Sequence, residues 1–412
     1  MNNQKIENIE TEEVNEFLII KNFGPIKNLK LDLKNSTLLI GPQGSGKSTI
    51  AKLIAIFRDY KVLFNNADLL EFFNKYNIRN YFLKSSNEQN LILGNTYLEY
   101  SCPHYKITYN NEFTITRNRF FQSALDSEEK RIDKLINDIS LKETKRSNSD
   151  DGRRQMLLDL FNTNKELFSK LFLNLIQDSV YIPAERSLTS IISESPFGFM
   201  NSGISLPKFI TDFGNLFEQA RKSITEFNID FLNIRYKFEQ SQNKVYFEKK
   251  NFIKLSESAS GYQAIIPLLL VLEYLCKNLT YKYSFVVEEP ELNLFPVSQK
   301  FLINLLVSKC SKNNNELVIT THSPYVLSSF SNLLFAFQVA NKSPEKEKKV
   351  EKIISRNSWL DPDNFNAYYI VDGQAEPIFN RKTQLIDENQ LDKVSDIIGD
   401  EYDALMQIYI EK

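Results

Sequence analysis

The order of apolar and polar positions predicts an α/β fold from the first residues onward. Residues 17–23, 29–33 and 35–40 alternate or run apolar, as short β-strands do. In residues 48–64 the apolar positions recur at helical spacing. We therefore expect strand, glycine-rich loop and helix in that order, which is how many α/β domains begin.

The pattern then changes several times along the chain. Residues 66–123 mix short helices with strand-like segments, and residues 124–178 are charge-rich with helical periodicity and a polar break at 142–155. We interpret 124–178 as a helical insertion with an exposed tip. It is either a solvated helical pair without a function of its own or a docking arm for a partner. The α/β pattern returns at residues 178–186.

Further elements are expected in the second half. A helix at about 206–228 precedes a pair of strands within 231–255, and the last 70 residues contain a strand (AYYIVD), a turn at Gly373 and two acidic helical pieces. No internal repeat is visible.

The glycine-rich segment Gly41 to Ser48 reads GPQGSGKS and fits the phosphate-loop pattern G-x-x-x-x-G-K-[ST]. Its glycines allow the backbone N–H groups to surround phosphates, and the following helix directs its positive end at the same anion. Lys47 is expected to reach the β and γ phosphates, and Ser48 to bind Mg²⁺. The sequence therefore predicts ATP and Mg²⁺ as cofactors, with nucleotide contacts from Gly41, Gln43, Gly44, Ser45, Gly46, Lys47, Ser48 and Thr49.

Two later strands end in groups that suit the same chemistry. An apolar strand ends at Glu288 and Glu289, and about 30 residues later another ends just before His322. The first acid is expected to support Mg²⁺, usually through water, and the second to deprotonate the attacking water. His322 is expected to sense the γ-phosphate. The alternatives are a solvated acidic turn and, for His322, a place beside a helix N-cap at Ser323.

A second anion site is indicated by Ser260 and Gly261, which begin a strongly apolar helix. The chain already has one complete phosphate loop. The segment from Ala259 to Gln263 resembles the ABC signature L-S-G-G-Q, in which this site binds the γ-phosphate held by the opposite subunit. Tyr262 replaces the second signature glycine.

Together, KNFGPIKN, YIPAER, SASGYQ, VVEEPELNLFP and TTHSPYVL resemble the AAA-15/AAA-21 group of ABC-like ATPases, which are relatives of the SMC, Rad50, RecF and OLD ATPase domains. The resemblance implies an ABC-type P-loop ATPase head with mixed sheets. It also implies catalytic roles for Lys47, Glu289 and His322, and metal binding by Ser48 and Glu288. Further contacts are implied for Asn22 with nucleotide, for Ser260 and Gly261 across a homodimer, and for Asn293 at the dimer seam. Gln122 is a candidate for the Q-loop glutamine.

Four parts are expected on this basis. Residues 1–123 and 179–344 form the two halves of the ATPase domain, 124–178 is the helical insertion, and 345–412 is a C-terminal α/β extension. The insertion has no CxxC zinc hook and no long heptad run, and the last 90 residues show no TOPRIM-like acidic pattern. We therefore expect neither a long coiled-coil arm nor a nuclease domain.

Composition narrows the class of protein. Lys and Arg number 50 against 52 Asp and Glu, so the net charge of −2 gives no support for a dedicated nucleic-acid binder. Cys102, Cys276 and Cys310 lack a metal or disulfide spacing, and no apolar run reaches the roughly 18–20 residues of a membrane helix. We expect a cytoplasmic protein without membrane contact, with His104 in a surface turn.

Three roles remain open. The first is a two-component antiviral defence ATPase resembling those of the Septu, PARIS and retron-associated systems, which form homo-oligomers and control a separate effector, often a nuclease. The second is a DNA repair or recombination ATPase of RecF/Rad50 type that binds DNA. The third, a transporter ATPase subunit, is disfavoured by the long insertion.

Overall fold

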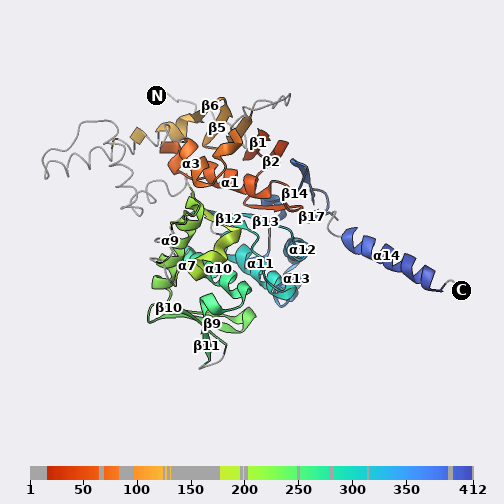
Figure 1. Cartoon of the computed structure of the whole chain (residues 1–412). Coiled ribbons are helices and arrows are strands. Elements are labelled where there is room, and N and C mark those ends of the chain that lie inside the picture. Colours follow the sequence, from red (N-terminus) through yellow and green to blue (C-terminus); the bar gives the residue numbers. More distant parts are fainter. Residues whose placement is uncertain are drawn as a thin grey trace, which may run out of the picture.

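The structure is a computed structural model of the whole chain (Figure 1). It describes residues 16–64, 69–82, 96–123, 177–194, 203–247, 251–277, 282–312, 315–387 and 393–410, with single positions between them. The expected helical insertion at 124–178 lies almost wholly outside the described residues.

A six-stranded sheet forms the centre of the molecule, in the order β15-β14-β3-β13-β12-β7. Strands β14, β3, β13, β12 and β7 run parallel to one another, and only β15 runs antiparallel, beside β14. Parallel strands buried on both faces read as apolar runs, which is why the sequence pattern marks them clearly. The strands are β3 Ser36–Ile40, β7 Asp178–Ile182, β12 Tyr283–Glu288, β13 Glu316–Thr321, β14 Phe365–Val371 and β15 Gln374–Pro377.

One face of this sheet is covered by helix α1 (Lys47–Phe57), which a five-stranded antiparallel sheet, β2-β1-β4-β5-β6, covers in turn. Alternate strand residues such as Leu39, Val286 and Val318 point into this core. The other elements here are β1 Phe17–Phe23, β2 Ile26–Asp32, β4 Tyr97–Ser101, β5 Tyr105–Asn110, β6 Glu112–Arg117, α2 Lys61–Phe64, α3 Leu69–Lys75 and the 3₁₀ turn Arg79–Phe82.

The opposite face is covered by helices (Figure 1). The intervening strand residues, among them Leu38, Val287 and Ile319, pack there. The helices are α7 Ser187–Ile192, α9 Lys208–Ser223, α10 Ser260–Cys276, α11 Pro296–Cys310 and α12 Pro324–Ala340, and short 3₁₀ turns lie at Ala184–Arg186, Asp230–Leu232 and Leu255–Glu257.

The expected strand pair within 231–255 is wrong in number. The structure has a four-stranded antiparallel sheet, β11-β10-β9-β8, with β8 Glu226–Ile229, β9 Ile234–Glu239, β10 Gln242–Tyr246 and β11 Phe252–Lys254. Asn233 takes the left-handed conformation with φ 52° and closes a 3₁₀ turn, so residues 231 and 232 lie outside β9. Asparagine tolerates this conformation better than most residues.

The C-terminal extension joins the central sheet through β14, which pairs with β3. It also contains α13 Pro344–Glu351, the 3₁₀ turns Arg356–Ser358 and Pro362–Asn364, a small hairpin of β16 Phe379–Asn380 and β17 Leu385–Ile386, and α14 Lys393–Ile410.

The expectation of two acidic helical pieces after Gly373 is therefore wrong for the first piece. Gln374–Pro377 pairs with β14 as a strand, and the Asn380 side chain accepts hydrogen bonds from the N–H groups of Lys382 and Thr383, which fixes a turn. Within the described residues, no helix is both long enough and apolar enough to cross a lipid bilayer.

Candidate functional site

Four parallel strands of the central sheet end at one edge, and each is followed by a polar segment. The register pairs Ile40 of β3 with Thr321 of β13, and Thr320 with Glu288 of β12. The loops that follow these strand ends, and the loop after β7, therefore meet at the carboxyl edge of the sheet. Open α/β sheets bind ligands at such edges.

The glycine-rich loop has two positions where only glycine fits. A Cβ at Gly41 would lie 2.1 Å from the carbonyl oxygen of Ile370 in β14, and one at Gly46 would lie 2.3 Å from Cδ1 of Ile26. Gly46 also has a φ of 104°, which disfavours side chains. No side chain caps helix α1, so its first N–H groups remain available to an anion.

Lys47 is folded back onto this loop. Its ammonium group donates to the carbonyl oxygens of Gly41 (2.9 Å) and Pro42 (2.8 Å) and lies 3.4 Å from Nδ1 of His322. Burial lowers the pKa of Lys47 to about 8, although the carboxylates of Glu289, Glu291 and Glu288 oppose this. A lysine with this pKa is still mostly protonated at neutral pH and lies within reach of phosphates entering the loop.

Glu288 ends β12 as a buried carboxyl, and burial raises its pKa. The hydroxyls of Tyr181 and Ser48 face it and act in the opposite direction. Within the described part of the chain, Oε1 of Glu288 is buried, and no hydrogen bond of ordinary geometry reaches it although these hydroxyls face the carboxyl. A buried carboxylate oxygen without a partner, beside the Ser48 hydroxyl, is a donor set that fits a hard divalent cation such as Mg²⁺.

Glu289 and His322 form a hydrogen-bonded pair in the same loop region. Glu289 Oε1 and His322 Nε2 are 2.8 Å apart, and both side chains are partly exposed. Because the other ring nitrogen faces the Lys47 ammonium, a neutral ring with its proton on Nε2 satisfies both contacts. The Glu289 backbone has a φ of 41°, rare for a residue with a side chain, and its N–H donates to the carbonyl oxygen of Thr320.

The sequence pattern assigns no role to Glu291, and the structure places it under His322. Its Oε1 accepts from the Thr321 hydroxyl (2.5 Å) and from the backbone N–H of His322 (3.0 Å). Burial raises the pKa of this carboxyl. Glu291 therefore fixes the backbone that carries the histidine, which a consecutive-acid pattern alone does not indicate.

Arg186 is a second residue that the sequence analysis left without a role. It is fully buried, and its guanidinium donates to the carbonyl oxygens of Glu288 (2.8 Å), Glu289 (2.8 Å) and Pro290 (3.1 Å). Its Nε donates to the carbonyl oxygen of Ala264 in α10 (3.1 Å). One side chain therefore connects the loop that carries Glu289 with helix α10.

Burial lowers the pKa of Arg186 to about 10, and the nearby carboxylates of Glu291, Glu289 and Glu288 limit the decrease. The guanidinium stays charged at neutral pH. The only sequence signal for it is the segment YIPAER, in which an arginine follows a buried strand by four residues.

Helix α10, with Ser260 and Gly261 at its start, lies on the face of the sheet opposite α1 (Figure 1). Ser260 is exposed, and a Cβ at Gly261 would lie 2.6 Å from the carbonyl oxygen of Asn293. The structure thus brings Asn293 against the start of α10.

Two candidates lie at a distance from the centre of the site. Asn22 is exposed near the end of strand β1, where its backbone has a φ of 51°, and it lies near Ile26, whose side chain packs over Gly46. The Gln122 side chain accepts a hydrogen bond from Arg117 and donates one to Asp126. Arg117 also donates a hydrogen bond to the carbonyl oxygen of Leu63, which lies beyond the C-terminal end of α1. The structure therefore does not bring Gln122 to the phosphate loop.

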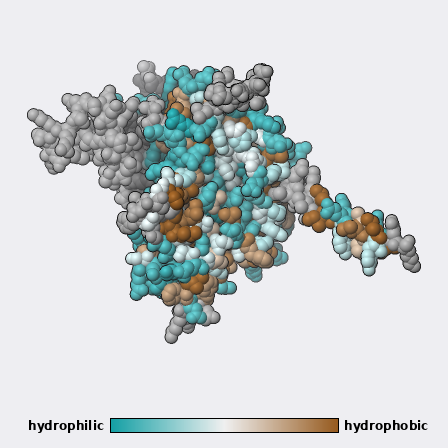
Figure 2. All heavy atoms as spheres, in the orientation of Figure 1, coloured by the Kyte–Doolittle hydropathy of each residue, from teal (hydrophilic) through white to brown (hydrophobic). Residues whose placement is uncertain are grey.

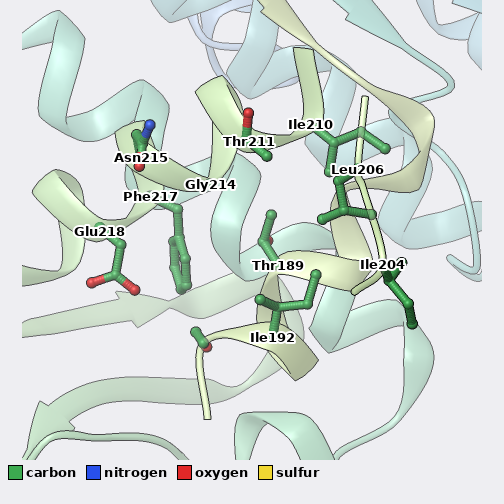
Figure 3. A pocket seen from close by; sticks show the side chains of 11 residues that line it. Thr189, Ile192, Ile204, Leu206, Ile210, Thr211, Gly214, Asn215, Phe217 and Glu218 are labelled. Carbon is green, nitrogen blue, oxygen red and sulfur yellow. The ribbon is translucent and has the colours of Figure 1, made fainter. Parts of the chain in front are cut away.

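A separate hollow of about 320 Å³ lies between α7 and α9 (Figure 3). Its walls carry mainly apolar side chains, including Ile192, Leu206, Ile210 and Phe217, with Glu218 at one side. None of the residues that line it comes from the phosphate loop or from the acidic loop after β12. It is therefore no part of the site at the carboxyl edge.

Comparisons with solved structures gave matches of low identity and low TM-score. The SMC head domain from Thermotoga maritima is 14% identical, covering 88% of this chain and 98% of that one, with a TM-score of 0.38. A second match is the Smc head domain with an extended coiled coil bound to the C-terminal domain of ScpA, from Pyrococcus furiosus. It is 12% identical, the match covers 94% of this chain and 99% of that one, and the TM-score is 0.36. A third match is the recombination mediator protein RecF-ATPrS of the RecFOR pathway. It is 12% identical, the match covers 88% of this chain and 98% of that one, and the TM-score is 0.36.

No curated protein matches the chain. The family model described as AAA ATPase domain matches residues 16–195 and 68–327, which together span more than half of the sequence and contain the phosphate loop, the start of α10, Glu289 and His322. Because none of the three TM-scores reaches 0.5, the assignment rests on this family model. The chain belongs to the AAA-15 family of ABC-like ATPases.

Proposed function

We propose that this ATPase binds ATP with Mg²⁺ and hydrolyses it at a site shared by two copies of the chain. The observation that carries the proposal is the connection from Lys47 through His322 to Glu289, with contacts of 3.4 and 2.8 Å at the edge of the sheet. It joins the phosphate loop to the two groups that a hydrolytic step requires, a phosphate sensor and a general base.

On entry of the nucleotide, the Lys47 ammonium exchanges the carbonyl oxygens of Gly41 and Pro42 for phosphate oxygens. The loop N–H groups and the start of α1 bind the remaining phosphate charge. Ser48 and Glu288 would hold Mg²⁺, which would supply charge neutralisation on the phosphate oxygens. Metal binding also favours the ionised form of the buried Glu288 carboxyl.

Glu289 then acts as general base. It accepts a proton from a water molecule whose oxygen attacks the γ-phosphorus, while the bond from that phosphorus to the β–γ bridging oxygen breaks and ADP leaves. In the free protein, the Nε2–H group of His322 donates a hydrogen bond to Glu289, and in the complex the ring is in place to orient the water or the γ-phosphate. Arg186 and Glu291 hold the backbones of these two residues in position.

The site is incomplete within one chain. The exposed start of α10 at Ser260 offers N–H groups and a hydroxyl to an anion, yet it lies on the other face of the sheet from α1. A second copy that presents Ser260 and Gly261 to the γ-phosphate completes the charge stabilisation. Asn293, packed against Gly261, lies at the same seam.

In the cell, we propose that ATP binding and turnover control a separate effector protein in antiviral defence, with a nuclease as the expected effector. The resemblance of the motifs to those of two-component defence ATPases supports this role. The alternative is a RecF/Rad50-type ATPase that binds DNA, and the net charge of −2 weighs against it. Purification together with the neighbouring gene product separates the two, because the defence role requires a stable complex and the repair role requires salt-dependent DNA binding.

Mixing two inactive variants tests the shared site. Lys47→Ala removes the phosphate contact, and Ser260→Arg blocks the start of α10, so each protein alone should lose nearly all ATP hydrolysis. A mixed dimer contains one site with intact Lys47 and intact Ser260, and we expect the mixture to recover up to about a quarter of wild-type turnover per chain. Phosphate release at several mixing ratios measures this.

Two results would overturn the proposal. Wild-type turnover by Lys47→Ala alone would refute the phosphate-loop assignment. A mixture that stays as inactive as its components, although both variants are folded and Ser260→Arg still binds ATP, would refute the shared site.

A further inference from the structure

Helix α14 is the one element in the described part of the chain that stands apart from the body of the molecule (Figure 1). Every residue from 397 to 410 is exposed. None of these side chains belongs to the hydrophobic cores that the described residues form. An isolated helix of 18 residues is marginally stable in water, so a helix this apolar needs a partner surface.

The apolar side chains of α14 form a continuous seam. Ile398, Tyr402, Leu405 and Tyr409 are spaced by four, three and four residues, which places them on one side of the helix, and they are 60–84% exposed. Met406 and Ile408 flank this seam. Figure 2 shows hydrophobic residues along the projecting helix.

The charged side chains constrain what covers the seam. Asp400 and Asp403 lie on the opposite side of the helix, and Glu401 lies beside the seam. Helices that bind lipid surfaces carry Lys and Arg on the polar side, so this acidic helix does not suit an anionic membrane. Because the two aspartates point away from the seam, two copies of α14 meet without bringing them together.

We propose that α14 pairs with α14 of a second copy of this chain, and that this contact holds two copies together without nucleotide. Spacing by four and three residues is the pattern of a coiled-coil seam, which complements itself. An antiparallel pair places Ile398 opposite Tyr409 and Tyr402 opposite Leu405, so that an aliphatic side chain meets an aromatic ring in each layer. It also aligns the two helix dipoles favourably.

The size of the contact indicates its strength. Burying the seam and its two flanking side chains removes on the order of 600 Å² per helix from water, somewhat below the ~800 Å² per partner of a standard interface. The pair is therefore expected to form at micromolar concentration and to dissociate on dilution. The proposal does not depend on ATP hydrolysis, and it concerns a surface far from Ser260.

Sedimentation of the full chain without nucleotide and with a metal chelator tests this. We expect wild type to be a dimer at micromolar concentration, and Leu405→Glu to weaken association about tenfold or more, because a carboxylate then lies in the centre of the seam. Gln407→Glu is the matched control. It adds the same side chain two positions away, on the outer side of the helix, and should leave the dimer intact.

Monomeric wild-type protein under these conditions would overturn the proposal and leave α14 to a different protein. So would a Leu405→Glu variant that associates as tightly as wild type, because the contact would then lie elsewhere. Removing residues 393–412 provides a second variant with the same expected loss of the dimer. In either variant, the mixing experiment with Lys47→Ala and Ser260→Arg continues to report on the ATP site by itself.

Discussion

The central sheet has a buried arginine at each end of its strands, and the two are satisfied in different ways. Arg58, at the amino ends of β12 and β13, forms ion pairs with Glu16 and Glu316 at 2.7 and 2.9 Å. Arg186, at the carboxyl ends of β7 and β12, donates to backbone carbonyl oxygens and to no carboxylate. Burial lowers the pKa of both groups, but at Arg58 the two carboxylates outweigh it and raise the pKa well above its ordinary value.

This difference indicates that one end of the sheet contributes mainly to stability and the other to the proposed chemistry. At the Arg58 end, one guanidinium pairs with two carboxylates, and these ion pairs hold the amino end of β13 to the residue before β1. At the Arg186 end, the arginine holds the backbone of the acidic loop and leaves the carboxylates of Glu288 and Glu289 free for a cation, a water molecule and His322. A buried cation that bonded those carboxylates directly would compete with the proposed chemistry.

The largest expected difference comes from the same substitution made at one carboxylate at each end of the sheet. Glu289→Gln should lower kcat for ATP hydrolysis by about 10²–10⁴-fold with ATP affinity retained, because the amide cannot accept the water proton. Glu316→Gln, the same substitution at the other end, should leave kcat unchanged. Single-turnover hydrolysis and ATP binding assays measure both. Equal losses of kcat in the two variants would contradict the division of roles.

The two arginines provide a second pair of variants. Arg186→Lys keeps a positive charge but cannot span the carbonyl oxygens of three consecutive residues, so the Glu289 loop should lose its position and kcat should fall by up to about 100-fold. ATP affinity should change little, because Lys47 and the glycine-rich loop are untouched. A steady-state comparison of kcat with the ATP dissociation constant measures this split.

Arg58→Met should act on stability instead. It leaves Glu16 and Glu316 buried without their partner, which is expected to cost about 3–5 kcal/mol of the free energy of unfolding. The folded fraction should hydrolyse ATP at the wild-type rate. If Arg58→Met lowered kcat as much as Arg186→Lys at equal folded fraction, the contrast between the two ends would be lost.

The smallest expected effect is a pH dependence of ATP affinity, which arises from Lys47 at the carboxyl edge of the sheet and not from the Arg58 end. The pKa of Lys47 is about 8, so the ammonium is charged below pH 8 in the free protein and loses its proton above it. Phosphate binding favours the charged form, so ATP affinity should be constant below pH 8 and fall by about tenfold per pH unit above it. Lys47→Arg should remove this decrease. Titration of ATP binding between pH 7 and 9.5 measures both curves.

Much of the fold could be predicted from local sequence. The segment from Ser36 to Phe57 contains strand, loop and helix as a single pattern, and the buried strands β12 and β13 stand out as apolar runs that end in polar residues. The family is likewise apparent from the motifs and their order. These predictions succeed because each depends on residues that are neighbours in the chain.

The features that the sequence did not predict, or predicted wrongly, depend on contacts between residues far apart in the chain. Arg186 meets carbonyl oxygens 102 to 104 positions away, and a backbone acceptor leaves no trace in the residue type. Glu291 has a role because of Thr321 and His322, 30 and 31 positions later. The extra strands around Asn233 and the strand after Gly373 depend on pairing partners that periodicity does not identify.

Gly41 and the carbonyl oxygen of Ile370 are in close contact although 329 positions (370 − 41) separate them. A ribosome therefore has to complete β14 before the sheet beside the phosphate loop is whole. Contacts of such long sequence separation form slowly and late. A nascent chain that has emerged only as far as α12 carries every proposed catalytic side chain but lacks the strand against which the loop rests. We therefore expect the chain to capture nucleotide only once it is almost fully made, and fragments released early should be unable to take up ATP.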